Sequence, residues 1–305
     1  MSIQVQQLCK QYGSQLAVNN ISFEARPGQI TGFLGPNGAG KSTTMKMLTG
    51  YLQPDSGTAL VSGLNVVTAP EKVKQQIGYL PESNALYYDL YIREYLAFTG
   101  ALYKVPNLKQ RVEDVITQVG LTIEANKKIG QLSKGYKQRV GLAAAIIHNP
   151  AVLILDEPTT GLDPNQIVEI RQVIKTLSED KTVLLSTHIM QEVEAICEQV
   201  IIINKGSIVA NAPLQQLRSK SDGQQLRVSF TETIEAEWLL RLPGILAAEK
   251  TDSQSWTLQT NNAQDARKAL MQLALNENLN IRSMQEGGSL ESIFRELTTN
   301  TVAEK

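Results

Sequence analysis

A single run of eight residues constrains the fold of this chain more than any other feature of the sequence. It matches the pattern G-x-x-x-x-G-K-S and consists of Gly35, Pro36, Asn37, Gly38, Ala39, Gly40, Lys41 and Ser42. A compact apolar strand is predicted before it at 30–34, and a helix after it at 42–49. In that context the glycines allow backbone N–H groups to surround phosphates, and the helix N-terminus contributes its positive dipole end. The run therefore predicts a phosphate-binding loop, and a chance glycine-rich turn is a poor alternative for a full match.

The loop assigns roles to individual side chains. We expect Lys41 to contact the β- and γ-phosphates as a point charge and Ser42 to bind Mg²⁺ through its hydroxyl. Thr43, the next residue, is assigned to the same nucleotide site. No Asn-Lys-x-Asp sequence, which would read guanine, follows the loop. The expected ligand is therefore ATP with Mg²⁺.

A second group of acidic residues follows a buried strand predicted at 151–156. Asp156 ends this strand and is placed to hold Mg²⁺, directly or through water. Glu157 comes next and is placed to accept a proton from an attacking water as general base. Strands often end in a charged residue simply because the chain meets solvent there. This pattern alone would therefore indicate a functional site or an ordinary surface position equally well. Beside a phosphate loop, it predicts a site.

The remaining pattern predicts an α/β domain over residues 1–218. Short alternating stretches at 3–34 predict an antiparallel β subdomain, with a turn after Tyr12. A helical insertion is expected at about 91–148, where Val112, Val115, Ile116 and Val119 recur at helical spacing. After it, strands alternate with helices, which predicts a parallel sheet covered by helices. The chain of 305 residues is long enough for this domain and a smaller one.

A polar run at 219–225 predicts a linker to a C-terminal accessory domain at 226–305. The expected order there is strand, helix, strand, strand, helix, strand, which is that of a ferredoxin-like α+β domain. Trp238, Trp256 and Phe294 are interpreted as core residues. We expect the domain to fold independently, and we favour a role in holding two subunits together.

Composition excludes several classes of function. Lys and Arg total 29 and Asp and Glu total 30, for a net charge of −1, so no nucleic-acid partner is expected. Cys9 and Cys197 are far apart and lack metal-ligand spacing, which favours a reducing compartment. The longest apolar stretch, 140–147, is too short to span a bilayer, and the N-terminal residues lack a signal sequence. We expect a cytoplasmic protein.

Over residues 1 to about 215, the sequence resembles the nucleotide-binding domain of ATP-binding-cassette (ABC) transporters, a P-loop NTPase fold. Leu132-Ser133-Lys134-Gly135-Tyr136 is similar to the family's signature motif. Ser133 would also be a natural N-cap, aiming the following helix dipole at an anion. The resemblance implies that Ser133 and Gly135 contact the γ-phosphate bound to a second copy of the chain, so that two protomers enclose two ATP molecules.

Further positions match motifs of the same family. Asp163 in Gly161-Leu162-Asp163 matches the D-loop, and His188 matches the switch histidine that touches the γ-phosphate. Tyr12 falls where the family places an aromatic ring that stacks on adenine. His148, at the end of a predicted helix, is instead interpreted as a partner of the helix dipole.

Two departures from the family pattern are visible. Lys134 and Tyr136 occupy positions where the signature has glycine and glutamine, and Glu82 replaces the usual Q-loop glutamine. Glu82 becomes a candidate metal ligand. These substitutions, with the C-terminal extension, resemble exporter cassettes that pair with separately encoded permeases, including drug, sodium, haem-maturation and gliding-motility systems.

The resemblance implies an ATPase, peripheral on the inner face of the cell membrane, that energises export by a separate membrane permease. One alternative is a non-transport cassette ATPase acting on nucleic acid or ribosomes, but such proteins usually carry a coiled-coil insertion, metal-binding cysteines or two cassettes in one chain. Another is a regulatory cassette that binds ATP without turnover. The intact Lys41, Asp156, Glu157 and His188 argue against it.

Overall fold

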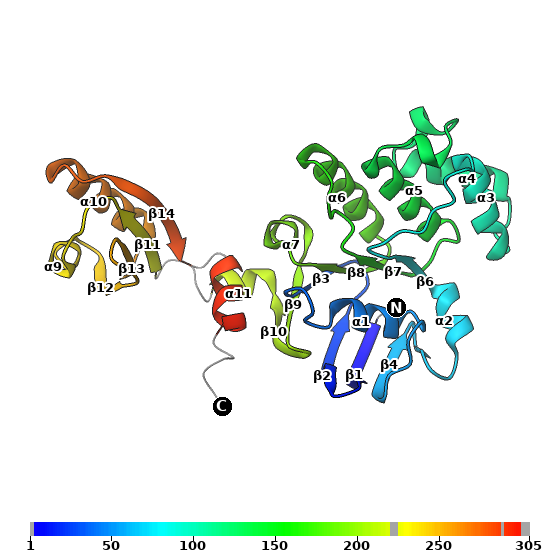
Figure 1. Ribbon diagram of the computed structural model, residues 1–305, viewed down its shortest axis with the longest axis horizontal. Helices are drawn as coiled ribbons and strands as arrows, with labels where there is room; N and C mark the ends of the chain where they lie inside the picture. Colours follow the sequence, from blue (N-terminus) through cyan, green and yellow to red (C-terminus); the bar gives the residue numbers. More distant parts are fainter. Residues whose placement is uncertain (1–2, 220–224, 288–289, 300–305) are drawn as a thin grey trace. The chain divides into compact units, whose positions relative to one another are not determined.

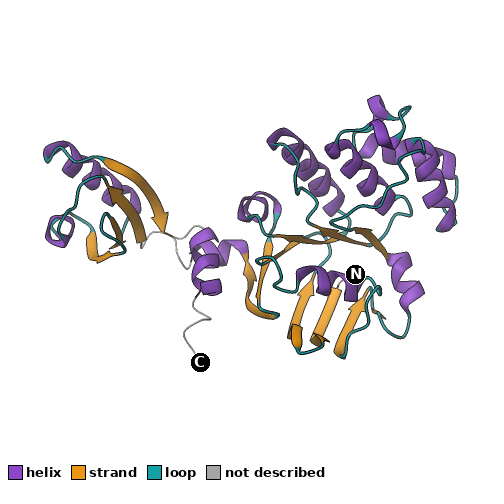
Figure 2. Cartoon of the chain, in the orientation of Figure 1, coloured by secondary structure: helices purple, strands orange, loops and turns teal. Residues whose placement is uncertain are grey.

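The computed structural model of the chain describes residues 3–219, 225–287 and 290–299. The chain divides into two compact units, Met1–Ala212 and Pro213–Lys305, whose strands and helices are drawn in Figures 1 and 2. Apart from its two end residues, the linker predicted at 219–225 lies outside the described residues. No helix within the described ranges is long and apolar enough to cross a membrane.

The first unit is built on a six-stranded sheet in the order β10-β9-β3-β8-β7-β6. The bounds are β3 (Ile30–Leu34), β6 (Ile77–Leu80), β7 (Val152–Asp156), β8 (Thr182–Thr187), β9 (Gln199–Asn204) and β10 (Ser207–Pro213). Strands β9, β3, β8, β7 and β6 run parallel, which confirms the predicted parallel sheet. Every residue of β3, β7 and β8 is buried, because both faces of the sheet are covered. The carboxyl ends of these three strands therefore meet at one edge.

A second, antiparallel sheet confirms the predicted β subdomain and has the order β2-β1-β4-β5. Its strands are β1 (Ile3–Tyr12), β2 (Gln15–Ala25), β4 (Ser56–Val61) and β5 (Leu64–Asn65). Figure 1 shows this sheet and α1 (Lys41–Leu48) on one side of the central sheet, with α5 (Lys134–Ile146), α6 (Pro164–Ser178) and α7 (Met190–Ile196) on the other. The rings of Phe23 and Phe33, one from each sheet, lie 5.4 Å apart within a shared apolar core. This packing fixes the hairpin of β1 and β2 against the loop that follows β3.

Helices cover the rest of the first unit. Their bounds are α2 (Pro70–Gln76), α3 (Ile92–Leu102), α4 (Leu108–Gln118), α5 (Lys134–Ile146), α6 (Pro164–Ser178) and α7 (Met190–Ile196), with 3₁₀ turns at Thr122–Glu124 and Ile129–Gln131. Val112, Val115, Ile116 and Val119 are buried, as their spacing predicts. Helices α3, α4 and α5 pack against one another, so the stretch predicted as a helical insertion is helical.

The interpretation of His148 as a helix-dipole partner is wrong. Arg111 takes that position: its Nε and Nη2 donate to the carbonyl oxygens of Ile147 and Ile146, at 2.9 and 2.7 Å. A guanidinium with several donors suits the unpaired carbonyls at the end of α5. His148 instead stacks on Tyr103, with ring centroids 3.8 Å apart, and its Nε2 lies 3.1 Å from the carbonyl oxygen of Ile77.

The second unit contains an antiparallel sheet in the order β12-β13-β11-β14. Its elements are α8 (Leu214–Ser219), β11 (Gln225–Phe230), α9 (Ala236–Leu240), β12 (Ile245–Lys250), β13 (Ser255–Thr260), α10 (Ala263–Asn276), β14 (Ile281–Gly287) and α11 (Leu290–Thr299). The first strand lies between the third and the fourth, which is the predicted ferredoxin-like arrangement. Trp256 is 4% exposed and belongs to the apolar core of the second unit, and Phe294 is half-buried. Trp238 is 38% exposed, so the prediction that it is a core residue is wrong.

Candidate nucleotide-binding and catalytic site

The loop from Gly35 to Ser42 joins the carboxyl end of β3 to the first turn of α1. Gly40 has φ of +107°, and a Cβ there would lie 2.5 Å from the carbonyl oxygen of Ala17 on β2. A side chain is therefore excluded both by conformation and by space. Helix α1 begins at Lys41, after the N-cap Gly40, and no side-chain hydrogen bond caps it. Free N–H groups at the start of a helix favour an anion.

Lys41 is buried, and its ammonium group is held by three oxygens. Its Nζ donates to the carbonyl oxygen of Gly35 at 2.8 Å and to that of Pro36 at 3.3 Å. Its Nζ also lies 3.4 Å from Oε1 of Glu157, forming an ion pair in which both side chains are 6% exposed. Pairing of this kind offsets the cost of burying each charge. The phosphate loop and the carboxylate after β7 are thus in direct contact.

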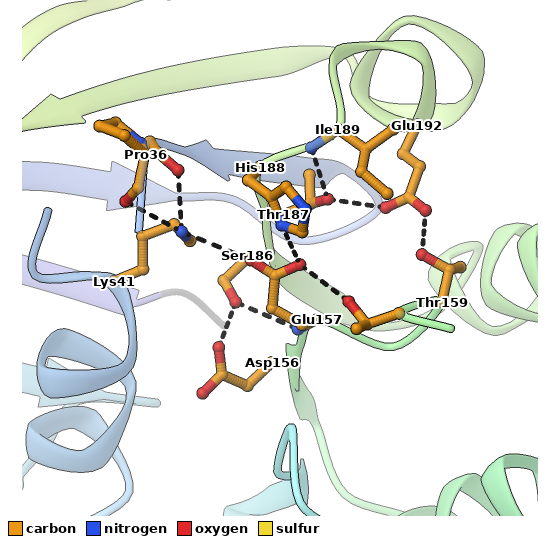
Figure 3. Close-up of polar contacts among 12 residues, drawn as sticks. Pro36, Lys41, Asp156, Glu157, Thr159, Ser186, Thr187, His188, Ile189 and Glu192 are labelled. Carbon is orange, nitrogen blue, oxygen red and sulfur yellow. Dashed lines mark hydrogen bonds and ion pairs between the residues drawn. The ribbon is translucent and has the colours of Figure 1, made fainter. Parts of the chain in front are cut away.

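Glu157 and His188 follow neighbouring parallel strands. Asp156 on β7 is in register with Ser186 on β8, so the residues after each strand end meet at the same edge. Nδ1 of His188 lies 2.8 Å from Oε2 of Glu157, and the Thr160 hydroxyl donates to the same oxygen at 3.2 Å. Figure 3 shows the two side chains turned toward each other.

The backbone at Glu157 is unusual for a residue with a side chain. Its φ is +51°, in the left-handed region. Its N–H donates to the carbonyl oxygen of Ser186 at 3.1 Å, which ties it to β8. Strained backbone of this kind gathers at functional sites, where the surrounding structure over-determines it. The carboxylate is consequently held under the phosphate loop.

Asp156 is buried at the end of β7 and accepts a hydrogen bond from the hydroxyl of Ser186. The same hydroxyl oxygen accepts from the N–H of Glu157 at 3.3 Å. Ser186 therefore orients both acidic residues. The charge of Asp156 is placed beside the cavity, although Asp156 is not among the residues that line it.

A cavity of about 610 Å³ gathers most of the predicted residues. Its predicted lining residues are Tyr12, Asn37, Gly38, Gly40, Lys41, Ser42, Thr43, Glu82, Glu157 and His188. Its lining also includes Gln15, Ala17 and Thr160, which belong to none of the sequence motifs. Gln15 is in register with Tyr12 across the hairpin, and Thr160 lies three residues after Glu157, so proximity to a predicted residue was the available signal. Gly35, Pro36 and Ala39 belong to the loop but do not line the cavity.

The predicted signature and D-loop residues lie together on a different part of the first unit. Ser133 is the N-cap of α5, as predicted, and its Oγ accepts from the N–H of Tyr136 at 3.4 Å. Asp163 is the N-cap of α6 and accepts from the N–H of Gln166 at 2.9 Å. A Cβ on Gly135 would lie 2.5 Å from the side chain of that same Gln166. The beginnings of α5 and α6 are thus packed together, and none of these residues lines the cavity.

This fold and this site define an ATPase of the ATP-binding-cassette class. The family described as ABC transporter matches residues 18–160, and the family described as ATP-binding protein DrrA1-3-like, C-terminal domain, matches residues 213–298. Linearmycin resistance ATP-binding protein LnrL of Bacillus subtilis (strain 168) is 34% identical over 308 residues, covering 98% of this chain and 99% of that protein. The chain belongs to the family of ABC transporter ATP-binding proteins.

Further comparisons agree with this assignment. Bacitracin transport ATP-binding protein BcrA of Bacillus licheniformis is 38% identical over 221 residues, covering 72% of each chain. A solved structure described as an ATP binding subunit of an ABC transporter has 29% sequence identity and a TM-score of 0.66. That match covers 72% of this chain and 93% of the other. The chain is therefore the ATP-binding, ATP-hydrolysing subunit of an ABC transporter.

Proposed function

We propose that this chain energises export through a separately encoded membrane permease, acting as a pair of copies on the inner face of the membrane. The observation that carries the catalytic part is the meeting of Lys41, Glu157 and His188 in one cavity. A further relative, Nod factor export ATP-binding protein I of Burkholderia orbicola (strain AU 1054), is 38% identical over 204 residues and is named for export, which supports this direction of transport.

The chemistry assigned to the cavity is hydrolysis of the terminal phosphate of ATP. The N–H groups at the start of α1 and the ammonium of Lys41 bind phosphate oxygens. Glu157 accepts the proton of the attacking water, and its carboxylate is held in place by Lys41, Thr160 and His188. His188, with its side chain 42% exposed, orients Glu157 and reaches the γ-phosphate.

Mg²⁺ fits the donors around the cavity. The hydroxyl of Ser42 and the carboxylate of Glu82 line the cavity, and the carboxylate of Asp156 lies beside it. Mg²⁺ prefers oxygen donors of this kind. Within the described ranges, no three or more His, Cys, Asp or Glu side chains form a metal site by themselves. Mg²⁺ usually takes one or two carboxylates together with substrate phosphates. A bound Mg²⁺ would neutralise charge that develops on those phosphates.

The second copy is proposed from the position of Ser133, Gly135 and Asp163. They form a surface at the beginnings of α5 and α6, away from the cavity lining. The N-terminus of the 13-residue α5 would contribute its dipole and N–H groups to the γ-phosphate held by the other copy. Two such surfaces and two cavities would close together on two ATP molecules.

The permease is proposed to dock in a groove between β6 and helices α3 and α5. This groove, about 600 Å³, has Tyr51, Tyr79, Tyr95 and Tyr103 in its lining, and Asn84 has a buried Nδ2 with no hydrogen-bond partner among the described residues. Tyr87 and Phe98, 58% and 48% exposed, stand nearby with ring centroids 6.1 Å apart. Exposed aromatic side chains are characteristic of protein contacts. Glu82, two residues before Asn84, links this groove to the ATP cavity.

Two measurements test the proposal. Phosphate release by the purified chain tests turnover, and a protein that binds ATP without releasing phosphate would be a regulatory cassette. Co-purification from membranes, followed by sequencing of the captured protein, tests the partner. A captured protein with about six hydrophobic spans supports the permease, whereas capture of ribosomes or nucleic acid would contradict it.

A further inference from the structure

We propose that Glu192 is a positioning residue for ATP hydrolysis, and this inference rests on the roles proposed for Glu157 and His188. Glu192 lies on α7 and its side chain is 1% exposed. Its carboxylate joins the segment that follows β7 to the last residue of β8. Neither the motifs of the sequence nor the lining of the cavity include it.

The first connection reaches the segment that carries Glu157. The hydroxyl of Thr159, itself buried, donates to Oε1 of Glu192. Thr159 is two residues after Glu157 and precedes Thr160, which donates to the Glu157 carboxylate. A displacement of Thr159 would therefore change the position of the proposed general base and of one of its hydrogen-bond donors.

The second connection reaches the segment that carries His188. The hydroxyl of Thr187 donates to Oε2 of Glu192 at 2.8 Å, and its oxygen accepts from the N–H of Ile189 at 3.1 Å. These two bonds hold the backbone on both sides of His188. Figure 3 shows Glu192 between Thr159 and Thr187. The residue after Thr187 is His188, which contacts Glu157, and Glu157 in turn pairs with Lys41.

The energetics favour a positioning role over a purely stabilising one. Burying a carboxylate is costly, and two hydroxyl donors only offset that cost. An apolar side chain of similar shape, with valines in place of the threonines, would be nearly neutral for stability. What the carboxylate adds is directional bonding between two loops, and a displacement of about 1 Å near reacting groups can cost on the order of 10²-fold in rate.

The test compares kcat and KM for ATP in three variants of the full chain. Glu192→Leu removes both bonds, Glu192→Gln keeps the shape with one acceptor oxygen, and the triple variant Thr159→Val, Thr187→Val, Glu192→Leu replaces the whole cluster with apolar groups. We expect kcat to fall about 10- to 10²-fold in Glu192→Leu, with KM and ATP-analogue affinity changed by less than about threefold. Glu192→Gln should lose less than Glu192→Leu, and the triple variant should remain stable with kcat still reduced.

Val193→Ala is the matched control, because Val193 is buried on the same helix and packs against β3 instead of the carboxylate cluster. It should lower thermal stability without lowering kcat. A kcat in the triple variant within twofold of the original chain would overturn the proposal, as would an equal loss in Val193→Ala. Normal turnover in Glu157→Gln would instead overturn the proposed function, so the two failures are distinguishable.

Discussion

Oε1 of Glu157 lies 3.4 Å from Nζ of Lys41, although the two residues belong to the segments that follow β7 and β3. The other oxygen of the same carboxylate contacts His188. One carboxylate thus joins the phosphate loop to the residue after β8. Substitutions at these positions should separate binding of ATP from its hydrolysis.

Glu157→Gln should abolish turnover while ATP binding is preserved. The amide keeps the shape and hydrogen bonding of the carboxylate but cannot accept a proton, so the loss should be at least about 10²- to 10⁴-fold. Phosphate release and sedimentation with ATP measure the two effects, and the variant should accumulate as an ATP-bound dimer. Glu71→Gln, on an exposed surface pair with Lys74, is the control and should hydrolyse ATP normally. A normal rate in Glu157→Gln would remove Glu157 from the mechanism.

Lys41→Ala should weaken ATP binding itself. A hydrogen bond to a charged group contributes about 1.5–3 kcal/mol, so affinity for a fluorescent ATP analogue should fall by about tenfold or more. The variant also leaves the buried Glu157 without its ion-pair partner, so the melting temperature should decrease. Lys46→Ala, on the exposed side of the same helix, should change neither quantity. Unchanged affinity in Lys41→Ala would contradict the phosphate-loop assignment.

Gly40→Ala should disrupt the loop, because the added Cβ would meet the backbone oxygen of Ala17. We expect a loss of unfolding free energy of more than about 2 kcal/mol, with weaker ATP binding. Gly13→Ala is the control: Gly13 also has positive φ, of +58°, but no atom lies within 4 Å of an added Cβ. It should cost only about 1 kcal/mol for the left-handed conformation. Urea unfolding compares the two, and equal losses would show that the contact with β2 is unimportant.

His148 should make the first unit less stable in mild acid. Burial has the largest effect on the pKa of His148 and lowers it below its usual value. The hydrogen bond to Ile77 has a smaller, opposing effect on this pKa, and the charge of Arg111 lowers it further. Below about pH 6.5 the unfolded chain binds a proton that the folded chain does not, so the free energy of unfolding decreases as pH falls toward the folded pKa.

Urea unfolding at pH 7.5 and at pH 5.5 measures this effect. His148→Gln removes the titrating group, so the difference in unfolding free energy between the two pH values should be smaller in the variant. The comparison uses the difference because loss of the stacking on Tyr103 lowers stability at both pH values. An unchanged difference would exclude His148 as a source of the acid sensitivity.

Truncation after Ser221 should leave a cassette that binds and hydrolyses ATP. The apolar core around Leu226, Val228 and Trp256 is built from residues at 226–284, and the proposed ATP contacts all precede residue 190. We expect weaker self-association, because we favour a role of the second unit in holding two copies together. Analytical ultracentrifugation without nucleotide compares the full and shortened chains. Equal association constants would favour a regulatory or permease-contacting role.

The sequence pattern was sufficient for the elements that depend on local order. The strand before Gly35, the helix after it, the parallel strands and the N-cap at Ser133 were all predicted, since each depends on periodicity or on residues a few positions apart. Ten of the site residues predicted from such patterns line one cavity.

Contacts between distant segments could not be predicted in the same way. The position of Ala17 against Gly40 depends on how two sheets pack, and the partner of the α5 carbonyls is Arg111, which is 36 residues from Ile147. Trp238 is exposed because the short α9 presents only one side to the core, and a local apolar count does not show which side. Glu192 looked like any polar residue of a helix, because its burial results from the packing of α7 beside β8.

The chain segment that forms the sheet of the second unit begins and ends at neighbouring positions, because Gln225 at the start of β11 is paired with Gly287 at the end of β14. A segment whose two ends lie side by side can be gained, lost or exchanged without a change in the path of the chain that precedes it. A graft of residues 225–287 from a relative would therefore need only two neighbouring junctions.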